Sequence, residues 1–350
     1  MNHKKDMHAE IGTFPQNRQV LYKILPIETP LALDLHITHR CNFRCNYCIL
    51  SRPDEELAAA DYGIGGLRRE IMSWETFSLI VEQLNAFPSK LKMITMSGIG
   101  EATTHPRIAD MVKALHDAGV TETIQIITNG ALLSRDMSDK LISAGLNELR
   151  ISLQGLTADK YFEICKAKID WDTYYDNICY FAQNKGDCTL KVKIVDTVLG
   201  EGDEEKFYSL FGDICDAIAV EHVYNPWEVN GLCSKHKMLP TDKTRYGREF
   251  REIAVCPRPF TRMDILPDGT VTQFCHVCFG HEKNVREMPL YVQWNGDRQN
   301  ELRINQLKGL RNEYPQCKRC TFVTNTWHPE DILDGHEAEI LERMQSKGMV

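Results

Sequence analysis

The alternation of strand-like and helix-like segments restricts this chain more than any other feature of its sequence. The six strand-like segments are 31–38, 91–98, 122–130, 147–155, 189–199 and 217–225. Helical patterns separate most of them, for example 73–87, which begins with the good N-cap residue Ser73, and 108–119, which ends at Gly119. Strands joined through helices pair in parallel. The sequence therefore predicts an α/β fold, either an open parallel sheet or a barrel.

The predicted strands are not apolar on both faces, as strands covered by helices on both sides would be. Apolar side chains alternate with Arg150, Ser152 and Gln154 in one segment, and Lys193 interrupts the apolar run of another. In a single strand this pattern is typical of an exposed edge. Repeated over several strands, it predicts a curved sheet whose concave face lines a ligand cavity.

Composition narrows the class of protein. The chain has 350 residues, and its net charge of −8 disfavours nucleic acid or an anionic membrane as a partner. No apolar run approaches the ~20 residues of a membrane span. The polar N-terminus lacks the apolar segment of a signal peptide, so the 13 cysteines are expected to be thiols and metal ligands in a cytoplasmic protein.

Three of these cysteines stand close together in "RCNFRCNYC". Cys41, Cys45 and Cys48 have C-x3-C-x2-C spacing, whereas structural zinc sites and ferredoxin clusters take four ligands. The triplet therefore predicts a metal centre with one position open for another molecule, and a zinc site or structural thiol cluster is the alternative. The next cysteine, Cys165, falls in a helical pattern and is predicted to be a small core side chain.

A triplet of this spacing at the end of a first strand resembles the radical SAM superfamily. The resemblance implies a partial (β/α)6 barrel in which the three thiolates hold a [4Fe–4S] cluster. The fourth iron of that cluster binds S-adenosylmethionine (SAM), and reductive cleavage of SAM yields a 5′-deoxyadenosyl radical that abstracts hydrogen from a substrate. It also implies a flavodoxin- or ferredoxin-type reductant as partner.

The resemblance extends to other strand ends. "MSGIGEATTHP" is similar to the glycine-rich segment of the family, although Ala102 stands where the family usually has proline. The positions that match SAM contacts of the family are Tyr47, Gly98, Gly100, Glu101, Asn129, Ser152 and Gln154. A turn or helix-cap role is the alternative for the last three.

A second group of cysteines lies near the C-terminus. "CPRPFTRMDILPDGTVTQFCHVC" reads as a β-hairpin around Pro267–Gly269 and resembles the SPASM/twitch extension of radical SAM enzymes. The resemblance implies one auxiliary [4Fe–4S] cluster, with Cys256, Cys275, Cys317 and Cys320 as its ligands. Cys278 is an alternative to Cys275, and a zinc site in the same thiolates is the alternative to the cluster.

These motifs divide the chain. The predicted parts are an N-terminal arm (1–30), a radical SAM partial barrel (31–226), a linker (227–254), a small α+β SPASM/twitch iron–sulfur domain (255–325) and a C-terminal helical tail (326–350). The arm before the first strand is shorter than the leader-binding domain that many peptide maturases carry.

The short arm and the single auxiliary cluster favour a small-molecule oxidoreductase of the dehydrogenase or epimerase type. The pattern resembles aminocyclitol dehydrogenases and proteins of carbohydrate biosynthesis. It predicts oxidation of a carbohydrate-like or aminocyclitol alcohol, with the auxiliary cluster as electron acceptor. A peptide- or protein-modifying maturase is one alternative. A non-catalytic iron–sulfur carrier or zinc-binding scaffold is another.

Such an oxidation needs a base near the carboxyl ends of the later strands. Lys193, Glu221 and His222 qualify by position, although only one of the last two, as neighbours in a strand, can point inward. Lys193 would need a lowered pKa, which burial beside Arg150 would provide. Arg150 and Tyr224 are the predicted substrate contacts.

Overall fold

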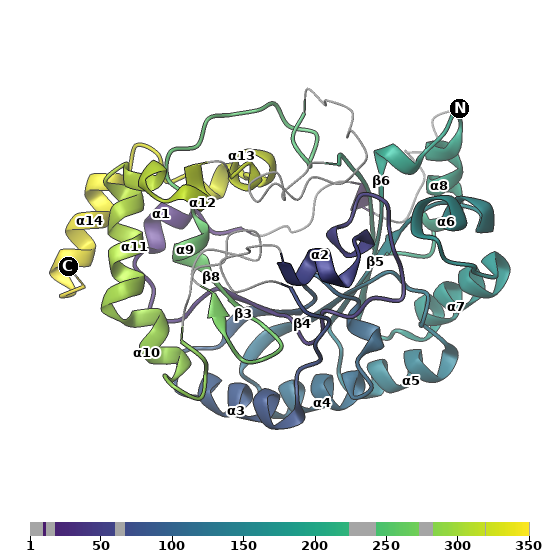
Figure 1. The fold of residues 1–350 in the computed structure, drawn as a ribbon, viewed down its shortest axis with the longest axis horizontal. Helices are drawn as coiled ribbons and strands as arrows, with labels where there is room; N and C mark the ends of the chain where they lie inside the picture. The colour runs from purple at the N-terminus through teal and green to yellow at the C-terminus, as the bar shows by residue number, and fades with distance from the viewer. Residues whose placement is uncertain are drawn as a thin grey trace.

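A computed structural model gives the architecture of the chain (Figure 1). It describes residues 10–11, 18–59, 67–223, 243–272, 283–318 and 320–349. Within these residues no helix combines the length and the apolar character that crossing a membrane requires.

The predicted parallel sheet is confirmed. The described strands form one nine-stranded sheet in the order β1-β7-β6-β5-β4-β3-β2-β8-β9. Its first seven strands are β1 (Glu10–Ile11), β2 (Ala32–Leu35), β3 (Leu91–Met96), β4 (Thr121–Thr128), β5 (Glu148–Leu153), β6 (Thr189–Val195) and β7 (Ala217–Glu221). Strands β2 to β7 pair in parallel in sequence order, as a partial (β/α)6 barrel requires.

The C-terminal hairpin extends this sheet beyond β2. Strand β8 (Arg262–Ile265) pairs in parallel with β2, and β9 (Val271–Thr272) pairs antiparallel with β8. The turn between them depends on Gly269, whose φ of 91° lies in the left-handed region that glycine adopts without strain. The predicted hairpin therefore forms, and it also places the C-terminal segment at the edge of the barrel.

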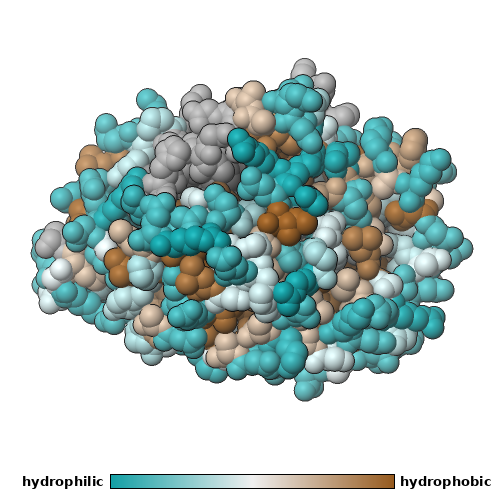
Figure 2. Space-filling model, turned by 60° about the horizontal axis from the view of Figure 1, so that its bottom comes forward, coloured by the Kyte–Doolittle hydropathy of each residue, from teal (hydrophilic) through white to brown (hydrophobic). Residues whose placement is uncertain are grey.

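Helices cover the outer face of the barrel (Figure 1). They are α3 (Trp74–Leu84), α4 (Ile108–Ala118), α5 (Arg135–Ser143), α6 (Ala158–Cys165), α7 (Trp171–Asn184) and α8 (Asp203–Phe211). Ser73 caps α3 by accepting a hydrogen bond from Thr76 N–H, and Gly119 ends α4 in the left-handed conformation. On the face that carries these helices, hydrophobic side chains lie in small patches among hydrophilic ones (Figure 2).

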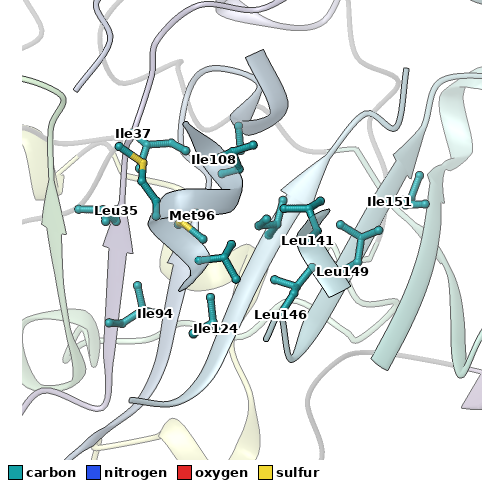
Figure 3. Packing of buried hydrophobic residues seen from close by; sticks show 14 of the residues in the cluster. Leu35, Ile37, Ile94, Met96, Ile108, Ile124, Leu141, Leu146, Leu149 and Ile151 are labelled. Carbon is teal, nitrogen blue, oxygen red and sulfur yellow. The ribbon is translucent and has the colours of Figure 1, made fainter. Parts of the chain in front are cut away.

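The main core lies between the strands and these helices. Leu35, Ile94, Ile124 and Leu149 come from four neighbouring strands, and Figure 3 shows them with Leu141 of α5. Every one of these side chains is 2% exposed or less. The apolar residues of the strands therefore face the helices, which leaves the polar residues that alternate with them on the inner face of the barrel.

The C-terminal helices pack beside the amino ends of the strands, together with the N-terminal arm. They are α9 (Arg258–Thr261), α10 (Leu290–Asn295), α11 (Asp297–Leu307), α12 (Pro315–Lys318), α13 (Phe322–Thr326) and α14 (Glu337–Ser346). Leu21 of α1 (Leu21–Ile24) belongs to the same core cluster as Phe260 and Ile340. Arg343 of α14 also donates to the Tyr22 carbonyl. The arm and the tail thus share one core, which no local sequence pattern predicts.

Candidate functional site

The cysteine triplet lies on the loop that follows β2, at the carboxyl ends of the strands. This loop is held by the last turn of α6, because Arg44 N–H donates to the Cys165 carbonyl at 2.9 Å and Asn46 N–H donates to the Ile164 carbonyl at 2.8 Å. Cys45 lies between these two bonds. Tertiary contacts with the end of α6 therefore help to set the loop conformation.

Cys45 is also in contact with a fourth cysteine. Its Sγ lies 3.7 Å from the Sγ of Cys165, which is 1% exposed. This contact, together with burial, raises the pKa of Cys45 well above its usual range. Cys165 is a core residue, as predicted, but its place against the triplet was not foreseen, since no local pattern signals it.

The residue that follows α6 has a strained backbone conformation, and this conformation affects the carbonyls that hold the cysteine loop. Lys166 follows the helix with φ of 57°, and it is the one non-glycine residue with positive φ in the described chain. This conformation ends the helix, so the carbonyls of Ile164 and Cys165 turn toward the cysteine loop instead of continuing the helical ladder.

We expect Lys166→Gly to stabilise the protein by about 1 kcal/mol, because glycine adopts the left-handed conformation without the steric cost that lysine meets. The melting temperature should rise. Lys185→Gly is the matched control, since Lys185 ends α7 in a right-handed conformation with φ of −64° and glycine there should destabilise. Equal effects of the two changes would contradict this reading of the α6 terminus.

The three thiols fit an iron–sulfur cluster better than a single ion. Burial raises the pKa of Cys41 and of Cys48 to about 12, so both are neutral until a metal displaces their protons. Among the described residues, no three histidine, cysteine or acidic side chains converge as ligands of one ion would. In a cluster each thiolate binds a separate iron, so thiols spaced along one loop meet that demand.

The glycine-rich segment packs directly against the cysteine loop. A Cβ on Gly98 would lie 2.4 Å from the His36 ring, and one on Gly100 would lie 2.3 Å from the Thr38 carbonyl oxygen and 2.6 Å from that of Arg40. Glu101 N–H donates to the Arg40 carbonyl at 2.8 Å. The absence of side chains at these glycines is therefore what lets the ends of β2 and β3 meet.

Gly100→Ala should displace this segment, because the two obstructing atoms belong to the backbone and cannot move independently. We expect a destabilisation of about 1–3 kcal/mol, typical of overpacking, and a loss of SAM binding in equilibrium dialysis. Gly200→Ala is the control, since the nearest atom to its Cβ would be the Asp203 carboxylate oxygen at 3.3 Å. Unchanged SAM affinity in Gly100→Ala would show that the close approach is unimportant.

Glu101 is a buried carboxylate that accepts several hydrogen bonds. Its Oε1 accepts from Thr103 N–H at 3.0 Å and from the hydroxyls of Thr103 and Thr128, each at 2.6 Å, and its Oε2 accepts from Asn129 N–H at 2.7 Å. Burial nevertheless raises its pKa. Since each carboxylate oxygen offers about two acceptor positions and Oε2 accepts one bond among the described residues, Oε2 is the atom that an ammonium group such as that of SAM would meet.

A hydrogen-bond chain joins the other SAM-site residues predicted from the resemblance. Tyr47 donates to the Gln154 side-chain oxygen, and Gln154 N–H donates to the Tyr161 hydroxyl at 3.2 Å. Tyr161 bonds to Tyr174 at 3.0 Å, and Tyr174 donates to the Asn129 carbonyl at 2.9 Å. The structure thus brings Tyr47, Gln154 and Asn129 together through two tyrosines that were not singled out from the sequence.

Asn129 also reaches the cysteine loop itself. Its Nδ2 donates to the side-chain oxygen of Asn42, which follows Cys41, at 2.8 Å. Ser152 contributes its carbonyl, which accepts from the Gln154 side chain at 3.0 Å, and it is the register partner of Lys193 on β6. Lys193 therefore lies on the strand next to these residues.

Lys193 and Glu221 form a buried ion pair, and an arginine from within the predicted linker (227–254) joins it. Glu221 Oε2 accepts from Lys193 Nζ at 2.6 Å and from Arg245 Nη2 at 2.7 Å. Burial opposes the charged form of Glu221, but Arg245 and Lys193 outweigh it and hold its pKa well below the usual range. Glu221 is therefore a fixed carboxylate.

Burial disfavours the charged form of Lys193, and in contrast to Glu221 the partner of opposite charge does not outweigh this effect. Burial lowers its pKa to about 8, Glu221 opposes this change, and Arg245 and Arg150 add to it. The free amine of Lys193 is therefore accessible near neutral pH. Arg245 lies in a charge-rich segment and was not singled out, because nothing in its local sequence indicates which acid it meets.

The remaining base and substrate candidates pair with other acids or are not described. His222 turns from Glu221 and pairs with Asp196 at 2.8 Å. Arg150 donates to Glu148 at 3.3 Å on the inner face of the sheet. Tyr224 lies outside the described residues.

The inner face of the barrel is polar, as predicted, but at mid-depth it is filled. Thr95 donates to Gln125 at 3.1 Å, Gln125 donates to Glu148, and Lys191 donates to Glu148 at 2.7 Å. Thr95, Gln125 and Glu148 are each 5% exposed or less. At this depth the polar side chains bond to one another, whereas the cavity on this face lies at the amino ends of the strands.

The auxiliary cysteines lie at the amino ends of the strands. Arg311 brings their two segments together, since its guanidinium donates to the Ile253 carbonyl at 2.7 Å and to the Cys320 carbonyl at 3.2 Å. Ile253 comes just before Cys256, and Cys320 N–H donates to the Cys317 carbonyl at 3.1 Å.

The other two candidates for this centre are Cys275 and Cys278, which lie outside the described residues, as does most of the predicted linker. The choice between these two cysteines therefore stays a prediction, and so do the domain boundaries.

Comparison with known families matches both halves of the chain. The radical SAM superfamily matches residues 35–210, and SPASM, an iron–sulfur cluster-binding domain, matches residues 256–321. The first match covers the cysteine triplet and strands β3 to β6. The second begins at Cys256 and ends just after Cys320.

Curated relatives extend these matches. The chain is 32% identical to the tungsten-containing aldehyde ferredoxin oxidoreductase cofactor-modifying protein of Pyrococcus furiosus, over 83% of this chain and 87% of that protein. It is 29% identical to the GTP 3′,8-cyclase of Nostoc punctiforme, and there the match spans 49% of each chain.

Solved structures share the fold at low identity. BtrN in complex with AdoMet and 2-DOIA superposes with a TM-score of 0.53 at 16% identity, over 86% of this chain and 97% of BtrN. Streptococcus suis SuiB bound to precursor peptide SuiA gives a TM-score of 0.58 at 16% identity, over 81% and 69%. These likenesses support the barrel and its C-terminal extension as one architecture.

Proposed function

Since this chain belongs to the radical SAM superfamily, we propose that it oxidises an alcohol carbon of a carbohydrate-like or aminocyclitol molecule. The auxiliary cluster would accept the electron released. The enzyme uses SAM, a SAM-binding [4Fe–4S] cluster and an auxiliary iron–sulfur cluster. When bound, the first cluster supplies the electron that cleaves SAM and so generates the radical that abstracts hydrogen.

We assign the SAM-binding cluster to Cys41, Cys45 and Cys48, which the α6 terminus holds on one loop. Asn129, Gln154 and the backbone of Gly98 to Glu101 surround this loop and would orient SAM. Cys256, Cys317 and Cys320, with Cys275 or Cys278, are the ligands proposed for the auxiliary cluster.

Lys193 is the observation that favours alcohol oxidation. Loss of a hydrogen atom from the carbinol carbon leaves a radical that must release the hydroxyl proton and one electron to become a carbonyl. A base with a pKa near the working pH serves that proton best, and Lys193 has a pKa of about 8. Glu221 orients its ammonium and remains ionised throughout, so it positions the base without competing for the proton.

A modified cofactor is the second candidate substrate. The relative that is 32% identical over most of both chains is described as a cofactor-modifying protein. The same radical step would then act on a cofactor carried by, or destined for, another protein. A peptide-modifying reaction is the third candidate, since SuiB binds a precursor peptide.

Deuterium transfer tests the proposal directly. The reconstituted enzyme would be incubated anaerobically with SAM, dithionite and candidate polyols deuterated at their carbinol carbons. We expect deuterium in 5′-deoxyadenosine and a carbonyl product two hydrogens lighter than the substrate. If deuterium came from a tungsten-enzyme cofactor or from a peptide, and from no cyclitol or sugar, the substrate would belong to that class instead.

A further inference from the structure

A cavity of about 630 Å³ lies at the amino ends of the strands, at the opposite end of the barrel from the cysteine triplet. Ala32, Met93 and Thr123 form its inner wall, and they are register partners at the start of β2, β3 and β4. The volume falls within the ~300–1,000 Å³ of small-molecule sites.

The next inward layer of the barrel separates this cavity from the triplet. Asp34, Thr95 and Gln125 are register partners in β2, β3 and β4, two residues after the wall residues. All three are buried, and Thr95 donates to Gln125 at 3.1 Å. A molecule in the cavity is therefore distinct from one that meets the Cys41–Cys48 loop.

The residues that line the cavity include more cationic than acidic side chains, and two of the cations pair with Asp34 and Asp264 outside the lining. The cationic lining residues are Arg18, Lys92, Arg258 and Arg262, and the acidic ones are Glu122 and Asp331. Lys92 and Glu122 pair with each other at 2.6 Å and are about half exposed. Arg258 is committed to Asp34 and Asp264.

Two arginines of the lining have guanidinium N–H groups without an acceptor among the described residues. Arg262 uses Nη1 for both of its bonds to Asp34, at 3.0 and 2.8 Å, while its Nε and Nη2 meet no acceptor among the described residues. Arg18 donates to Asp331 through Nη1, while its Nε is buried without an acceptor among the same residues. A buried N–H group without an acceptor destabilises the folded protein, and a bound anion would supply that acceptor.

A buried histidine lies near two arginines at this end of the barrel. His328 is 3% exposed, and its Nε2 finds no hydrogen-bond partner in the described part of the chain. Burial first, and then Arg18 and Arg248, lower the pKa of His328 to about 3. Arg18 and Arg248 therefore disfavour a further positive charge beside His328.

The rest of the lining is apolar and aromatic. Tyr246, Phe322 and Trp327 line the cavity together with aliphatic side chains. The Arg248 guanidinium lies 5.7 Å from the centre of the Trp327 ring. A ligand in this cavity would therefore contact both cationic and apolar side chains.

We propose that this cavity binds a small molecule that carries a phosphate or carboxylate group on an apolar or aromatic body. Arg262 and Arg18 would hold the anion, since a guanidinium edge matches the oxygens of both groups. The aromatic side chains would hold the body. Pro257 and Phe322 of the lining follow the auxiliary cysteines Cys256 and Cys320 closely in sequence, so the ligand would lie beside the auxiliary centre. This site goes beyond the proposed oxidation.

Calorimetric titration of the anaerobic holoenzyme with phenyl phosphate, benzoate and phenol tests this site. We expect phenyl phosphate or benzoate to bind and phenol, which lacks the anion, to bind at least about tenfold more weakly. The comparison of phenyl phosphate with benzoate distinguishes a phosphate site from a carboxylate site. Equal affinity for phenol and both anions, or binding of none of them, would overturn the proposal.

Arg262→Gln and Arg18→Gln should each weaken binding of the anion by about tenfold or more. Lys113→Gln is the control, since Lys113 is exposed on α4 and pairs with Asp117. Melting temperatures identify a variant that has lost its fold, and the other variant then decides. Unchanged affinity in either folded arginine variant would overturn its assigned role, and unchanged affinity in both would overturn the site.

Discussion

Replacing Cys41, Cys45 and Cys48 together by alanine should abolish dithionite-dependent formation of 5′-deoxyadenosine, to the level seen without enzyme. The three side chains are the proposed protein ligands of the cluster that reduces SAM, and no described residue nearby offers a replacement set of three. Chromatographic measurement of 5′-deoxyadenosine under anaerobic conditions gives the result. The effect should be complete, because loss of the cluster removes the electron that cleaves SAM.

Iron content separates loss of this cluster from loss of the fold. Two [4Fe–4S] clusters predict about eight irons per chain, and the triple variant should keep about four, because the auxiliary ligands lie at the other end of the barrel. The matched control replaces Cys179, Cys188 and Cys215, which lie in the helix layer and at strand ends away from the loop. If the first variant cleaves SAM normally, or if zinc replaces the remaining iron, the assignment of the two centres is wrong.

The barrel strands were predictable because their signal is local. Each of β2 to β7 lies within the segment expected from its apolar alternation, apart from a difference of one residue at the start of β4. The pairing of β8 with β2 was not predictable. It joins Arg262 to Ala32 across most of the chain, and parallel pairing at such a separation leaves no local pattern.

The residues of the candidate site also fall into a group that local motifs indicate and a group that they do not. Motif spacing indicated Cys41 to Cys48 and the Gly98–Glu101 segment, and the structure shows these two segments in backbone contact. The residues that hold them, such as Cys165 and Tyr174, belong to helices whose only sequence signal is that of a core face. Supporting residues of this kind are set by tertiary packing, which sequence periodicity does not encode.

The polar inner face shows where an alternating pattern is ambiguous. The same alternation is produced by side chains that line an open cavity and by side chains that bond to one another across strands. Gln125 and Glu148 are register partners and bond directly, so their polarity is satisfied internally. Lys193 differs from them, because its charge is compensated by Glu221 while burial destabilises the ammonium itself.

Lys193→Arg should eliminate product formation while leaving SAM cleavage and deuterium transfer to 5′-deoxyadenosine at least partly intact. Arginine preserves the positive charge beside Glu221 but does not release a proton near neutral pH. A lost general base costs about 100- to 10,000-fold in the step that it serves. The measurement is the carbonyl product from the alcohol that passes the deuterium test, with 5′-deoxyadenosine counted in the same sample.

The pH dependence of product formation provides a second test of Lys193 as the base. A lysine with a pKa of about 8 is protonated below that pH, so product formation should rise as the pH passes from 7 to 9 and the free amine becomes the main form. Lys191→Met is the matched control, because Lys191 lies on the same strand and face and pairs with Glu148 instead. It should keep this pH profile. If Lys193→Arg forms product at the normal rate with the profile unchanged, the proton leaves by another route and Lys193 serves only to hold Glu221.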